Sequence, residues 1–443
     1  MNKLSRRAFM ATGLLAGGGI VLGIGIRPGH RTPELAELVK QDSGVLVNTW
    51  LKIMPDNSIT VITPHVEMGQ GANSVLAMML ADELDADWDT VSLEQAPAHE
   101  AYSNFHIIRE FLLPVQVPGM LEDTVNGSFL QLAKKMDMQV TGGSFSIRST
   151  GQRGMRVAGA AARKLFIEAA AASWGVPENE ISVEKSHIIH AASNRREPFV
   201  AFAKQVASRR GELTPVLKTP DQYRLMGKNI QRLDLPEKVD GSAVFGVDVE
   251  LPGMKYATVR CAPVFGCTVE SFDAAVAEAM PGVHKVVNLG NGIGVIADGY
   301  WQAKKAIDRV EVKYSHSTHA GSDSEKIYAA QRAGMEQAVT NGKEKKDFAS
   351  GDARAEIERA SETLAAEYQV PTLAHATMEP MNATAWVQGD AIKLWGGLQN
   401  PLRIRNHLVN EMGYAPDKVD VQVTYLGGGF GRRSTVDYPE QAV

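Results

Sequence analysis

The chain has 443 residues, of which 44% are hydrophobic and 22% are charged, and its formal net charge is −5 at pH 7. The length allows two or three domains, and the composition is that of an ordinary globular protein. Basic residues form only short pairs such as Arg195-Arg196. The sequence therefore gives no support for binding to nucleic acid or to a membrane surface through charge.

The two cysteines, Cys261 and Cys267, limit the redox chemistry of the chain. An iron–sulfur cluster needs about four cysteine ligands, so this chain does not hold one. The sequence is compatible with a disulfide between the two cysteines and with a pair of buried thiols, and the frequent burial of cysteine favours the thiols. If electrons leave the protein, a partner must carry the centre that accepts them.

Residues 1–26 are predicted to be an export signal. Lys3, Arg6 and Arg7 precede an uncharged stretch, and residues 5–10 resemble the twin-arginine signature. The twin-arginine route exports folded proteins, which suits a protein that receives a cofactor in the cytoplasm. We therefore expect the periplasm or the periplasmic face of the inner membrane. A plain membrane anchor at the amino terminus is the alternative.

The first glycine-rich loop follows a predicted hairpin. After a polar connector, residues 27–47, two short alternating strands flank the turn at 55–57. The second strand leads into Glu67-Met68-Gly69-Gln70-Gly71. A helix beginning near Asn73 and a strand at 91–93 come next.

The second loop, Gly142-Gly143-Ser144-Phe145-Ser146, is predicted to repeat this order of strand, loop, helix and strand. Its helix spans about 154–174 and closes at Gly175. The segment between the two loops, residues 99–140, reads as a long excursion, which is often a lid or the wall of a site. We assign residues 48–205 to one domain.

Composition changes after this domain. Residues 206–232 are polar with scattered prolines and are assigned as a linker. Short strand patterns then dominate residues 233–315, whereas residues 316–360 read as a solvated connector with helical character. The last region is 361–443.

The third loop, Gly427-Gly428-Gly429-Phe430-Gly431-Arg432-Arg433, ends a predicted βαβ unit. A strand at 392–395 turns into a helix that Asn400 caps, and a strand at 419–425 precedes the loop. A right-handed crossover places Gln399 and the triple glycine at the same edge of a parallel sheet, where α/β proteins usually bind ligands.

Three such loops in one chain indicate a large polyanionic cofactor that is held from several sides. Glycine lets backbone N–H groups approach a ligand closely, and a following helix N-terminus favours an anion. An isolated triple glycine would more often be a tight turn without a ligand, so the recurrence carries the argument.

Several polar residues near these loops have a structural interpretation as well. Gln70 is also explained as an exposed turn residue, and Ser144 and Ser146 as caps of the following helix. For other residues near the site, a structural interpretation is favoured: His375 and Glu379 as a structural pair, Trp395 as a core residue, and His65 and His106 as polar loop residues. For Arg432 and Arg433, a surface charge and a role at the site are equally compatible with the sequence.

With these motifs in this order, the chain resembles the molybdopterin-binding large subunits of the xanthine dehydrogenase/aldehyde oxidase family. The resemblance covers residues 48–443 and is closest to the exported branch typified by isoquinoline 1-oxidoreductase beta subunits. Lys238-Val239-Asp240-Gly241 and Pro252-Gly253-Met254 look like parts of the family's α/β hammerhead domain. The implied fold class is α/β (α+β mixed), with molybdopterin-binding segments, 48–205 and 361–443, flanking a hammerhead at 233–315 in a permuted order.

The resemblance implies a molybdenum–molybdopterin cytosine dinucleotide cofactor, whose metal ligands come from the pterin rather than from protein side chains. It also implies hydroxylation of an aldehyde or an N-heterocycle with water as the oxygen source. Gln399 would then hydrogen-bond an oxygen ligand of molybdenum, with Phe430 and Gly431 beside it. The complete set of implied cofactor contacts is Gly69, Gln70 and Gly71 at the pterin, Ser144 and Ser146 at the pyrophosphate or nucleotide, and Gln399, Gly428, Gly429, Phe430, Gly431 and Arg432.

One departure from the family affects the functional prediction. The family's catalytic glutamate lies in a segment far downstream of the triple glycine, whereas this chain ends at Val443. No glutamate here matches it, so the catalytic base is expected beyond Val443 or on a second polypeptide. The expected electron partner is a small [2Fe–2S] subunit or a c-type cytochrome. The alternatives are a truncated, non-catalytic assembly module and, more weakly, a nucleotide- or flavin-dependent dehydrogenase, which the lack of a Gly-x-Gly-x-x-Gly opening disfavours.

Overall fold

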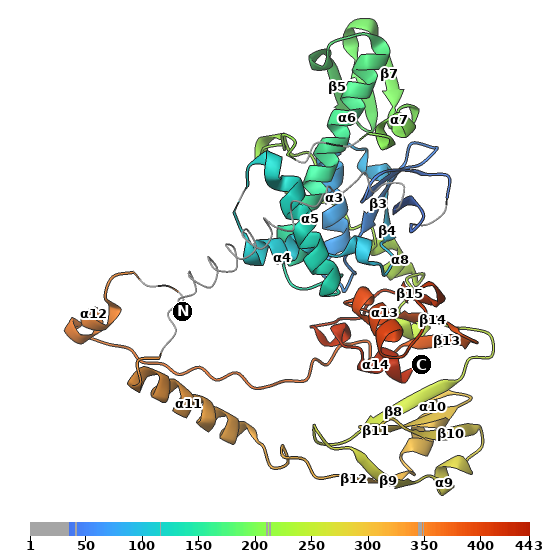
Figure 1. The fold of residues 1–443 in the computed structure, drawn as a ribbon, viewed down its shortest axis with the longest axis vertical. Helices are drawn as coiled ribbons and strands as arrows, with labels where there is room; N and C mark the ends of the chain where they lie inside the picture. The colour runs from blue at the N-terminus through green and yellow to red at the C-terminus, as the bar shows by residue number, and fades with distance from the viewer. Residues whose placement is uncertain are drawn as a thin grey trace. The chain divides into compact units, whose positions relative to one another are not determined.

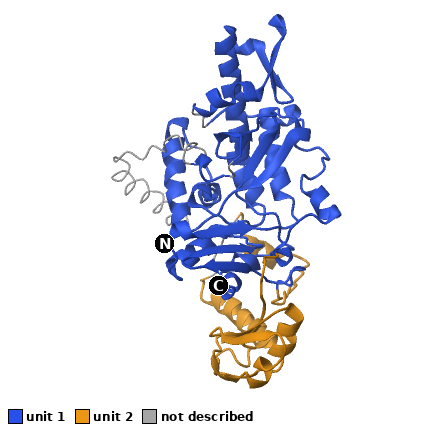
Figure 2. Cartoon of the chain, turned by 90° about the vertical axis from the view of Figure 1, so that its right-hand side faces the viewer, with its two compact units in different colours: residues 1–249, 375–443 blue, residues 250–374 orange. Residues whose placement is uncertain are grey.

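A computed structural model describes residues 35–39, 42–115, 117–209, 211, 214–343, 348 and 350–443. The predicted signal lies outside the described residues. The chain divides into two compact units: unit 1 comprises Met1–Val249 and His375–Val443, and unit 2 comprises Glu250–Ala374 (Figure 2). Helices and sheets are mixed in both, which confirms the predicted fold class. Within the described residues, no helix has both the length and the apolar character needed to span a membrane.

Unit 1 begins with a four-stranded sheet in the order β1-β2-β3-β4. Its strands are β1 (Val45–Asn48), β2 (Leu51–Ile53), β3 (Ile59–Thr63) and β4 (Val91–Gln95). β2 and β3 form the predicted antiparallel hairpin, and β4 runs parallel to β3 after a crossover through α3 (Ala72–Leu84). Strands β3 and β4 lie beside α3 in Figure 1. The predicted order of strand, glycine loop, helix and strand is confirmed here.

Helix α3 is buried on nearly every side because it packs against α6 (Arg156–Trp174) and also contacts β3 and β4. Leu76, Leu80 and Leu84 lie four residues apart and are fully buried, and burying each contributes about 1.5–3 kcal/mol. The two helices approach closely at Gly159, where an added Cβ would lie 2.3 Å from the carbonyl oxygen of Leu80. Only glycine permits that approach.

The second loop departs from the prediction. Residues 139–142 form no strand, so the expected strand before this loop is wrong. The predicted helix is present, but a π-helical segment, Ser146–Met155, precedes α6. Residues 99–140 contain two helices, α4 (Phe105–Leu112) and α5 (Gly119–Lys135), so the long excursion is not an irregular loop. Apolar side chains that include Ile108 and Phe129 hold these helices together.

The remaining elements of this half follow α6. They are β5 (Ile181–Glu184), β6 (His187–His190), β7 (Arg195–Pro198), α7 (Ala203–Ala207) and α8 (Leu235–Asp240). β5, β6 and β7 form an antiparallel sheet. Part of the predicted linker is fixed to α3: the buried Asp82 carboxylate accepts hydrogen bonds from the backbone N–H groups of Arg224 (3.0 Å) and Met226 (2.9 Å).

The carboxyl-terminal half of unit 1 repeats the topology of the first sheet. Its elements are β13 (Thr384–Gln388), β14 (Ala391–Gly396), α13 (Pro401–Asn410), β15 (Val419–Val423) and α14 (Asp437–Gln441). β13 and β14 form an antiparallel hairpin, and β15 runs parallel to β14 after the crossover through α13. The Asn400 side chain accepts a hydrogen bond from the Arg403 N–H, which confirms the predicted cap.

Unit 2 contains two antiparallel sheets. Its elements are β8 (Tyr256–Cys261), β9 (Val269–Asp273), α9 (Ala275–Glu278), β10 (Val283–Asn288), β11 (Gly292–Ala297), α10 (Tyr300–Ile307), β12 (Glu311–Tyr314), α11 (Ser324–Thr340) and α12 (Ala353–Arg359). The sheets are ordered β10-β11-β8 and β12-β9. Neither cysteine forms a disulfide. Cys267 is a buried thiol, as predicted. Cys261 is exposed, so the prediction of a buried thiol is wrong for this residue.

Candidate cofactor site

The second and third glycine-rich loops meet at the side chain of Gln399. This amide is 3% exposed. Its Nε2 donates to the Thr141 carbonyl oxygen (3.1 Å), and its Oε1 accepts from the backbone N–H groups of Gly431 (3.0 Å) and Arg433 (3.3 Å). The Thr141 N–H also donates to the Gln399 carbonyl oxygen at 2.9 Å. Gln399 and the triple glycine therefore share one place in the fold, as predicted.

The first loop joins the same place through its backbone. The Leu426 N–H donates to the Glu67 carbonyl oxygen (3.2 Å), and the Val66 N–H donates to the Thr141 hydroxyl (2.9 Å). A Cβ added at Gly429 would lie 2.6 Å from the Gln399 Oε1 and 2.8 Å from the Met68 sulfur. All three loops thus converge on a small region of unit 1.

We expect Gly429→Ala to separate these loops, because its Cβ has no room between Gln399 and Met68. The free energy of unfolding should fall by about 1–3 kcal/mol, as for other overpacked sites. Urea denaturation of the full chain measures this change. Gly142→Ala is the matched control, because nothing lies within 4 Å of an added Cβ there and its φ is not positive. Equal losses in the two variants would contradict the proposed crowding.

The third loop presents Phe430 to solvent. Gly428, Phe430 and Gly431 have φ angles of 95°, 52° and 93°. A positive φ is routine for glycine but costs a bulky residue of order 1–3 kcal/mol, so the surrounding structure must hold Phe430 in place. Its side chain is 72% exposed. Strain of this kind together with an exposed aromatic ring is typical of a ligand-binding loop.

Arg433 holds the third loop in place from the protein interior. Its interpretation as a surface charge is therefore wrong. Arg433 is fully buried and its Nη2 contacts the Glu379 Oε2 at 2.8 Å. Its Nε donates to the Gly428 carbonyl oxygen (2.8 Å), and the same Glu379 oxygen also accepts a hydrogen bond from the Gly427 N–H (2.8 Å). Glu379 is structural as favoured, but His375 is exposed and does not pair with it. Trp395 is partly buried rather than a full core residue.

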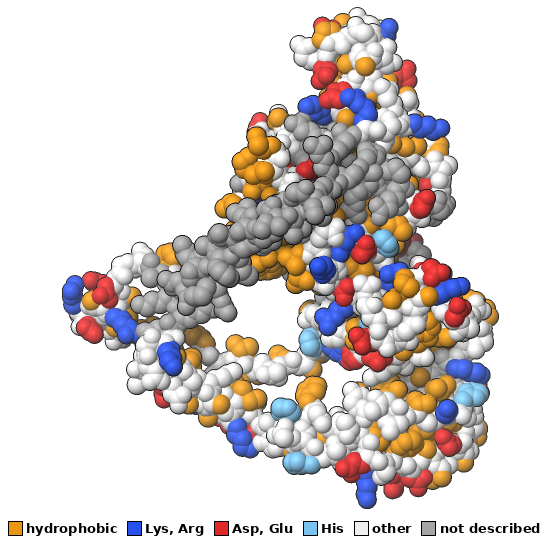
Figure 3. Space-filling model, viewed as in Figure 1, with side chains coloured by type: hydrophobic (Ala, Val, Ile, Leu, Met, Phe, Trp, Pro, Cys, Tyr) orange, Lys and Arg blue, Asp and Glu red, His pale blue; other side chains and the backbone are white. Residues whose placement is uncertain are grey.

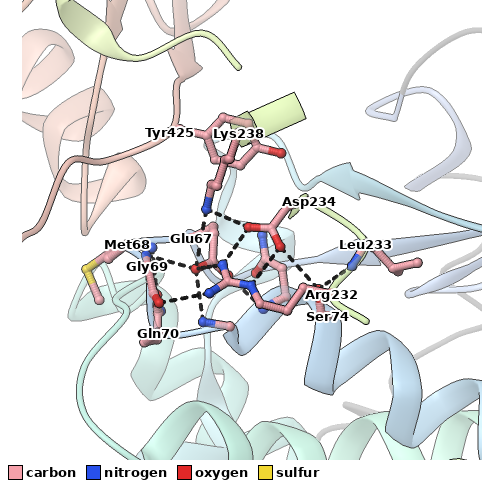
Figure 4. A network of polar contacts seen from close by, with 12 residues as sticks. Glu67, Met68, Gly69, Gln70, Ser74, Arg232, Leu233, Asp234, Lys238 and Tyr425 are labelled. Carbon is pink, nitrogen blue, oxygen red and sulfur yellow. Dashed lines mark hydrogen bonds and ion pairs between the residues drawn. The ribbon is translucent and has the colours of Figure 1, made fainter. Parts of the chain in front are cut away.

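Glu67 occupies the anion-binding position of the first loop. Its Oε1 accepts hydrogen bonds from the N–H groups of Gly69 (2.8 Å) and Gly71 (3.0 Å) at the start of α3. The Arg232 Nη2 lies 3.0 Å from the same oxygen (Figure 4). These two amides are therefore satisfied by the chain's own carboxylate. A cofactor would have to contact this loop through other atoms.

Arg232 and Lys238 connect Glu67 to Asp234. Arg232 Nη2 is 2.6 Å and Lys238 Nζ is 2.5 Å from the Asp234 carboxylate (Figure 4). Burial raises the pKa of the Asp234 carboxyl, but the hydrogen bonds from Arg232 and Lys238 outweigh burial and lower this pKa to about 2. The network keeps residues 232–238 attached to the first loop. The positions of these residues in the sequence did not predict this network.

The other predicted side chains on the first and third loops also bind within the protein. Gln70 is exposed; its Nε2 donates to the Val66 carbonyl oxygen (3.0 Å), and its Oε1 accepts from the Met68 N–H (2.6 Å). Arg432 forms a bidentate ion pair with Asp437 at 2.8 and 2.6 Å. Both residues therefore support the shape of their own loops.

The two serines of the second loop differ. Ser144 is exposed, whereas Ser146 is buried with its hydroxyl 3.3 Å from the His65 Nδ1. The His65 Nε2 lies 2.9 Å from the Thr150 hydroxyl. His65 lies in the loop after β3, as predicted, and is buried there. His106 is also buried but lies in α4, so its interpretation as a loop residue is wrong. In the described part of the chain, no group of three or more His, Cys, Asp or Glu side chains is arranged to hold a metal ion.

Two segments of the chain match models of a molybdopterin cofactor-binding domain, residues 6–103 and 335–443. These matches include the first and third glycine-rich loops. They lie on either side of a stretch that neither model covers. Two parts of one cofactor-binding architecture are thus separated in this sequence.

Curated relatives agree with these matches. The isoquinoline 1-oxidoreductase subunit beta of Brevundimonas diminuta is 29% identical over 90% of this chain and 52% of its own length. The membrane-bound aldehyde dehydrogenase [pyrroloquinoline-quinone] of Gluconacetobacter polyoxogenes is 26% identical over 98% of this chain and 53% of its own length. The chain therefore spans about half the length of these relatives.

Among solved structures, the match with the aldehyde oxidoreductase of Desulfovibrio gigas covers 87% of this chain and 48% of that protein's chain, with 13% sequence identity and a TM-score of 0.36. The two domain matches and the curated relatives support the resemblance of this chain to molybdopterin-binding subunits of the xanthine dehydrogenase/aldehyde oxidase family.

Proposed function

We propose that the chain is the cofactor-binding part of the large subunit of a molybdenum hydroxylase that oxidises an aldehyde or an N-heteroaromatic compound. The convergence of the three glycine-rich loops on the buried Gln399 amide carries this proposal. The names of the relatives, an isoquinoline oxidoreductase and an aldehyde dehydrogenase, support the two substrate classes.

The residues around Gln399 fit a molybdopterin cofactor. One N–H of the Gln399 amide binds Thr141, and among the described residues the other has no partner, so it suits an oxygen ligand. Added Cβ atoms at Gly142, Gly143 and Gly431 would meet nothing within 4 Å, which leaves room for a ligand beside the backbone. Phe430 would cover the ligand, and Ser144 is free to face a phosphate of a dinucleotide.

The amides of Gly69 and Gly71 do not fit a contact with this cofactor, because the Glu67 carboxylate already binds both. We propose that the first loop acts instead through its fixed shape, which places Met68 against Gly429. When bound, the cofactor would supply two-electron oxidation with water as the oxygen source. The residues of this chain would bind it, orient it and exclude solvent from one side.

Further parts of the proposal concern the whole protein. We propose the cytosine dinucleotide form of the cofactor, export by the twin-arginine route to the periplasm, and a small [2Fe–2S] subunit or a c-type cytochrome as the electron acceptor. The two cysteines of the chain are too few to hold an iron–sulfur cluster, which supports an external acceptor. The isoquinoline 1-oxidoreductase relative is itself named as subunit beta, which supports the proposal of a partner subunit.

A non-catalytic assembly module is the second candidate, and the buried carboxylates favour it. Glu67 and Glu379 are the glutamates in contact with the first and third loops, and both are paired with arginines. Neither is placed to act as a catalytic base, because each holds a loop in position. If the enzyme proposal holds, the base would come from the part of the relatives' length that this chain does not match.

The molybdenum content of the protein purified from its native cells tests the proposal. We expect about one atom per chain, and a fall of at least about tenfold in Gln399→Ala, because this change removes the amide that joins two loops and faces the ligand. Gln422→Ala is the control, since Gln422 is an exposed residue of β15. No molybdenum in the wild-type chain, or equal content in both variants, would overturn the proposal.

A further inference from the structure

Unit 1 contains a cavity of about 290 Å³ whose lining does not include Gln399. The cavity wall comes from β1 and the turn that follows it, α4, α5, the π-helical segment and α6. None of the predicted cofactor contacts is among the described residues that line this cavity. Since a cavity of roughly 150 Å³ is enough to bind benzene, this one has room for a small aromatic molecule.

Aromatic rings and short apolar side chains form much of the cavity wall. The imidazole of His106 packs against two other rings of the lining, with its centroid 5.9 Å from that of Trp50 and 3.9 Å from that of Phe105. Helix α6 adds further apolar side chains, none larger than leucine: Val157, Ala158, Ala161, Ala162 and Leu165. A wall of this kind favours a flat apolar ligand.

His106 also brings hydrogen-bonding capacity that the chain leaves unused. Its side chain is 5% exposed, and neither ring nitrogen forms a hydrogen bond with a described residue. The Nε2 atom is on the side of Gly154 and Trp50, since a Cβ added at Gly154 would lie 3.1 Å from Nε2 and 2.7 Å from the Trp50 ring. Both of these residues line the cavity. Buried polar groups are nearly always paired, so an unpaired Nε2 at a cavity wall points to a bound partner.

The charged side chains of the cavity lining are of both signs. Asp123 and Arg153 carry opposite charges, and Arg209 is paired with Glu168 at 2.8 Å. On the face of the molecule in Figure 3, basic and acidic side chains are interspersed, so this face does not attract ions of one sign. Because burying an ion without a dominant opposite charge is costly, the lining favours an uncharged ligand.

We propose that this cavity binds a small uncharged aromatic molecule that carries a hydroxyl group. The aromatic ring lies against Trp50 and Phe105, and the hydroxyl bonds with the Nε2 of His106. A hydroxyl both donates and accepts a hydrogen bond, so it fits either tautomer of the imidazole. The assignment goes beyond the proposed oxidation, because the residues that carry it are separate from the predicted cofactor contacts.

Ligand-observed NMR on the full chain tests the hydrogen bond, with phenol and toluene as probes. The two molecules have nearly the same shape, but only phenol has a hydroxyl. We expect phenol to bind with a Kd on the order of 1 mM, as for other ligands of this size. His106→Phe keeps an aromatic ring without the nitrogen, and it should weaken phenol binding at least about fivefold while leaving toluene binding unchanged.

His375→Phe is the matched control, because His375 is exposed and is not part of the lining. It should change the affinity for neither probe. No binding of phenol to the unsubstituted chain would mean that water alone fills the cavity, and it would overturn the proposal. An equal loss of both probes in His106→Phe would show that the ring packs against the ligand without bonding to it, which would overturn the hydroxyl assignment.

A second pair of substitutions tests the location of the ligand. Val157→Phe adds a ring to the cavity wall and should abolish the binding of both probes, whereas Val276→Phe, at an exposed position of α9, should not affect it. Gln399→Ala should also leave phenol binding unchanged. Loss of phenol binding in Gln399→Ala would place phenol at the cofactor site and overturn the assignment to this cavity. If Val157→Phe does not fold, the comparison of His106→Phe with Gln399→Ala still decides between the two places.

Discussion

Replacing Arg433 by methionine is expected to lower the free energy of unfolding of the chain by about 3–5 kcal/mol, the usual cost of leaving one partner of a buried ion pair without the other. Arg433 is fully buried, and the side chain of Glu379 is only 5% exposed. The guanidinium also donates to the carbonyl oxygens of Gly428 and Glu379 at 2.8 and 2.7 Å. Methionine fills a similar volume but leaves the carboxylate charged and unpaired.

Urea denaturation followed by tryptophan fluorescence measures this loss, since Trp395 lies on the adjoining strand β14. Arg432→Met is the matched control, because Arg432 is the neighbouring residue and its ion pair with Asp437 is partly exposed; we expect at most about 1 kcal/mol there. Adding Glu379→Gln to Arg433→Met should restore part of the stability. Equal effects of the two single changes would show that the buried pair does not hold the loop.

The local patterns of the sequence were sufficient to predict the elements that carry the first and third glycine-rich loops, but not the second, which no strand precedes. The alternation in β2 and β3, the spacing of leucines in α3, and the cap at Asn400 all act over a few residues. The parallel pairing of β14 with β15 then follows from the helical crossover that joins them. The meeting of Gln399 with the third loop was predictable for the same reason.

The residues that hold the site together could not be predicted in this way. Arg433 meets Glu379 across 54 positions of sequence, and Arg232 meets Glu67 across 165. Each looks like a surface charge when the sequence is read locally, because only the tertiary fold brings its partner near. The position of Glu67 before the first glycine-rich loop likewise did not predict that its carboxylate would accept hydrogen bonds from the backbone N–H groups of that loop.

The burial of two histidines has a consequence for the pH dependence of stability. Burial lowers the pKa of His65 to about 3. Burial, aided by the charges of Arg109 and Arg153, likewise lowers the pKa of His106 to about 3. Both imidazoles are therefore neutral in the folded protein at neutral pH. An unfolded chain binds these protons near pH 6.5, which is the ordinary pKa of histidine.

Stability from these residues is fully present above pH 6.5 and is lost as pH falls from 6.5 toward 3, because only the unfolded chain gains protons in that interval. Each histidine contributes a slope of about 1.4 kcal/mol per pH unit there, so the pair should cost about 4 kcal/mol between pH 8 and pH 5. Urea denaturation at several pH values measures this slope. His106→Phe, which keeps an aromatic ring without a titrating group, should remove about half of it.

His375→Gln is the control for this experiment, because His375 is exposed and its substitution should leave the slope unchanged. His65→Gln is a useful second variant: glutamine retains hydrogen-bonding capacity toward Ser146 and Thr150 but does not titrate in this range. If neither His65→Gln nor His106→Phe reduces the slope between pH 6.5 and 5, the two imidazoles are not buried as described. The second glycine-rich loop would then lack its internal support, since Ser146 depends on neutral His65 for its only described side-chain partner.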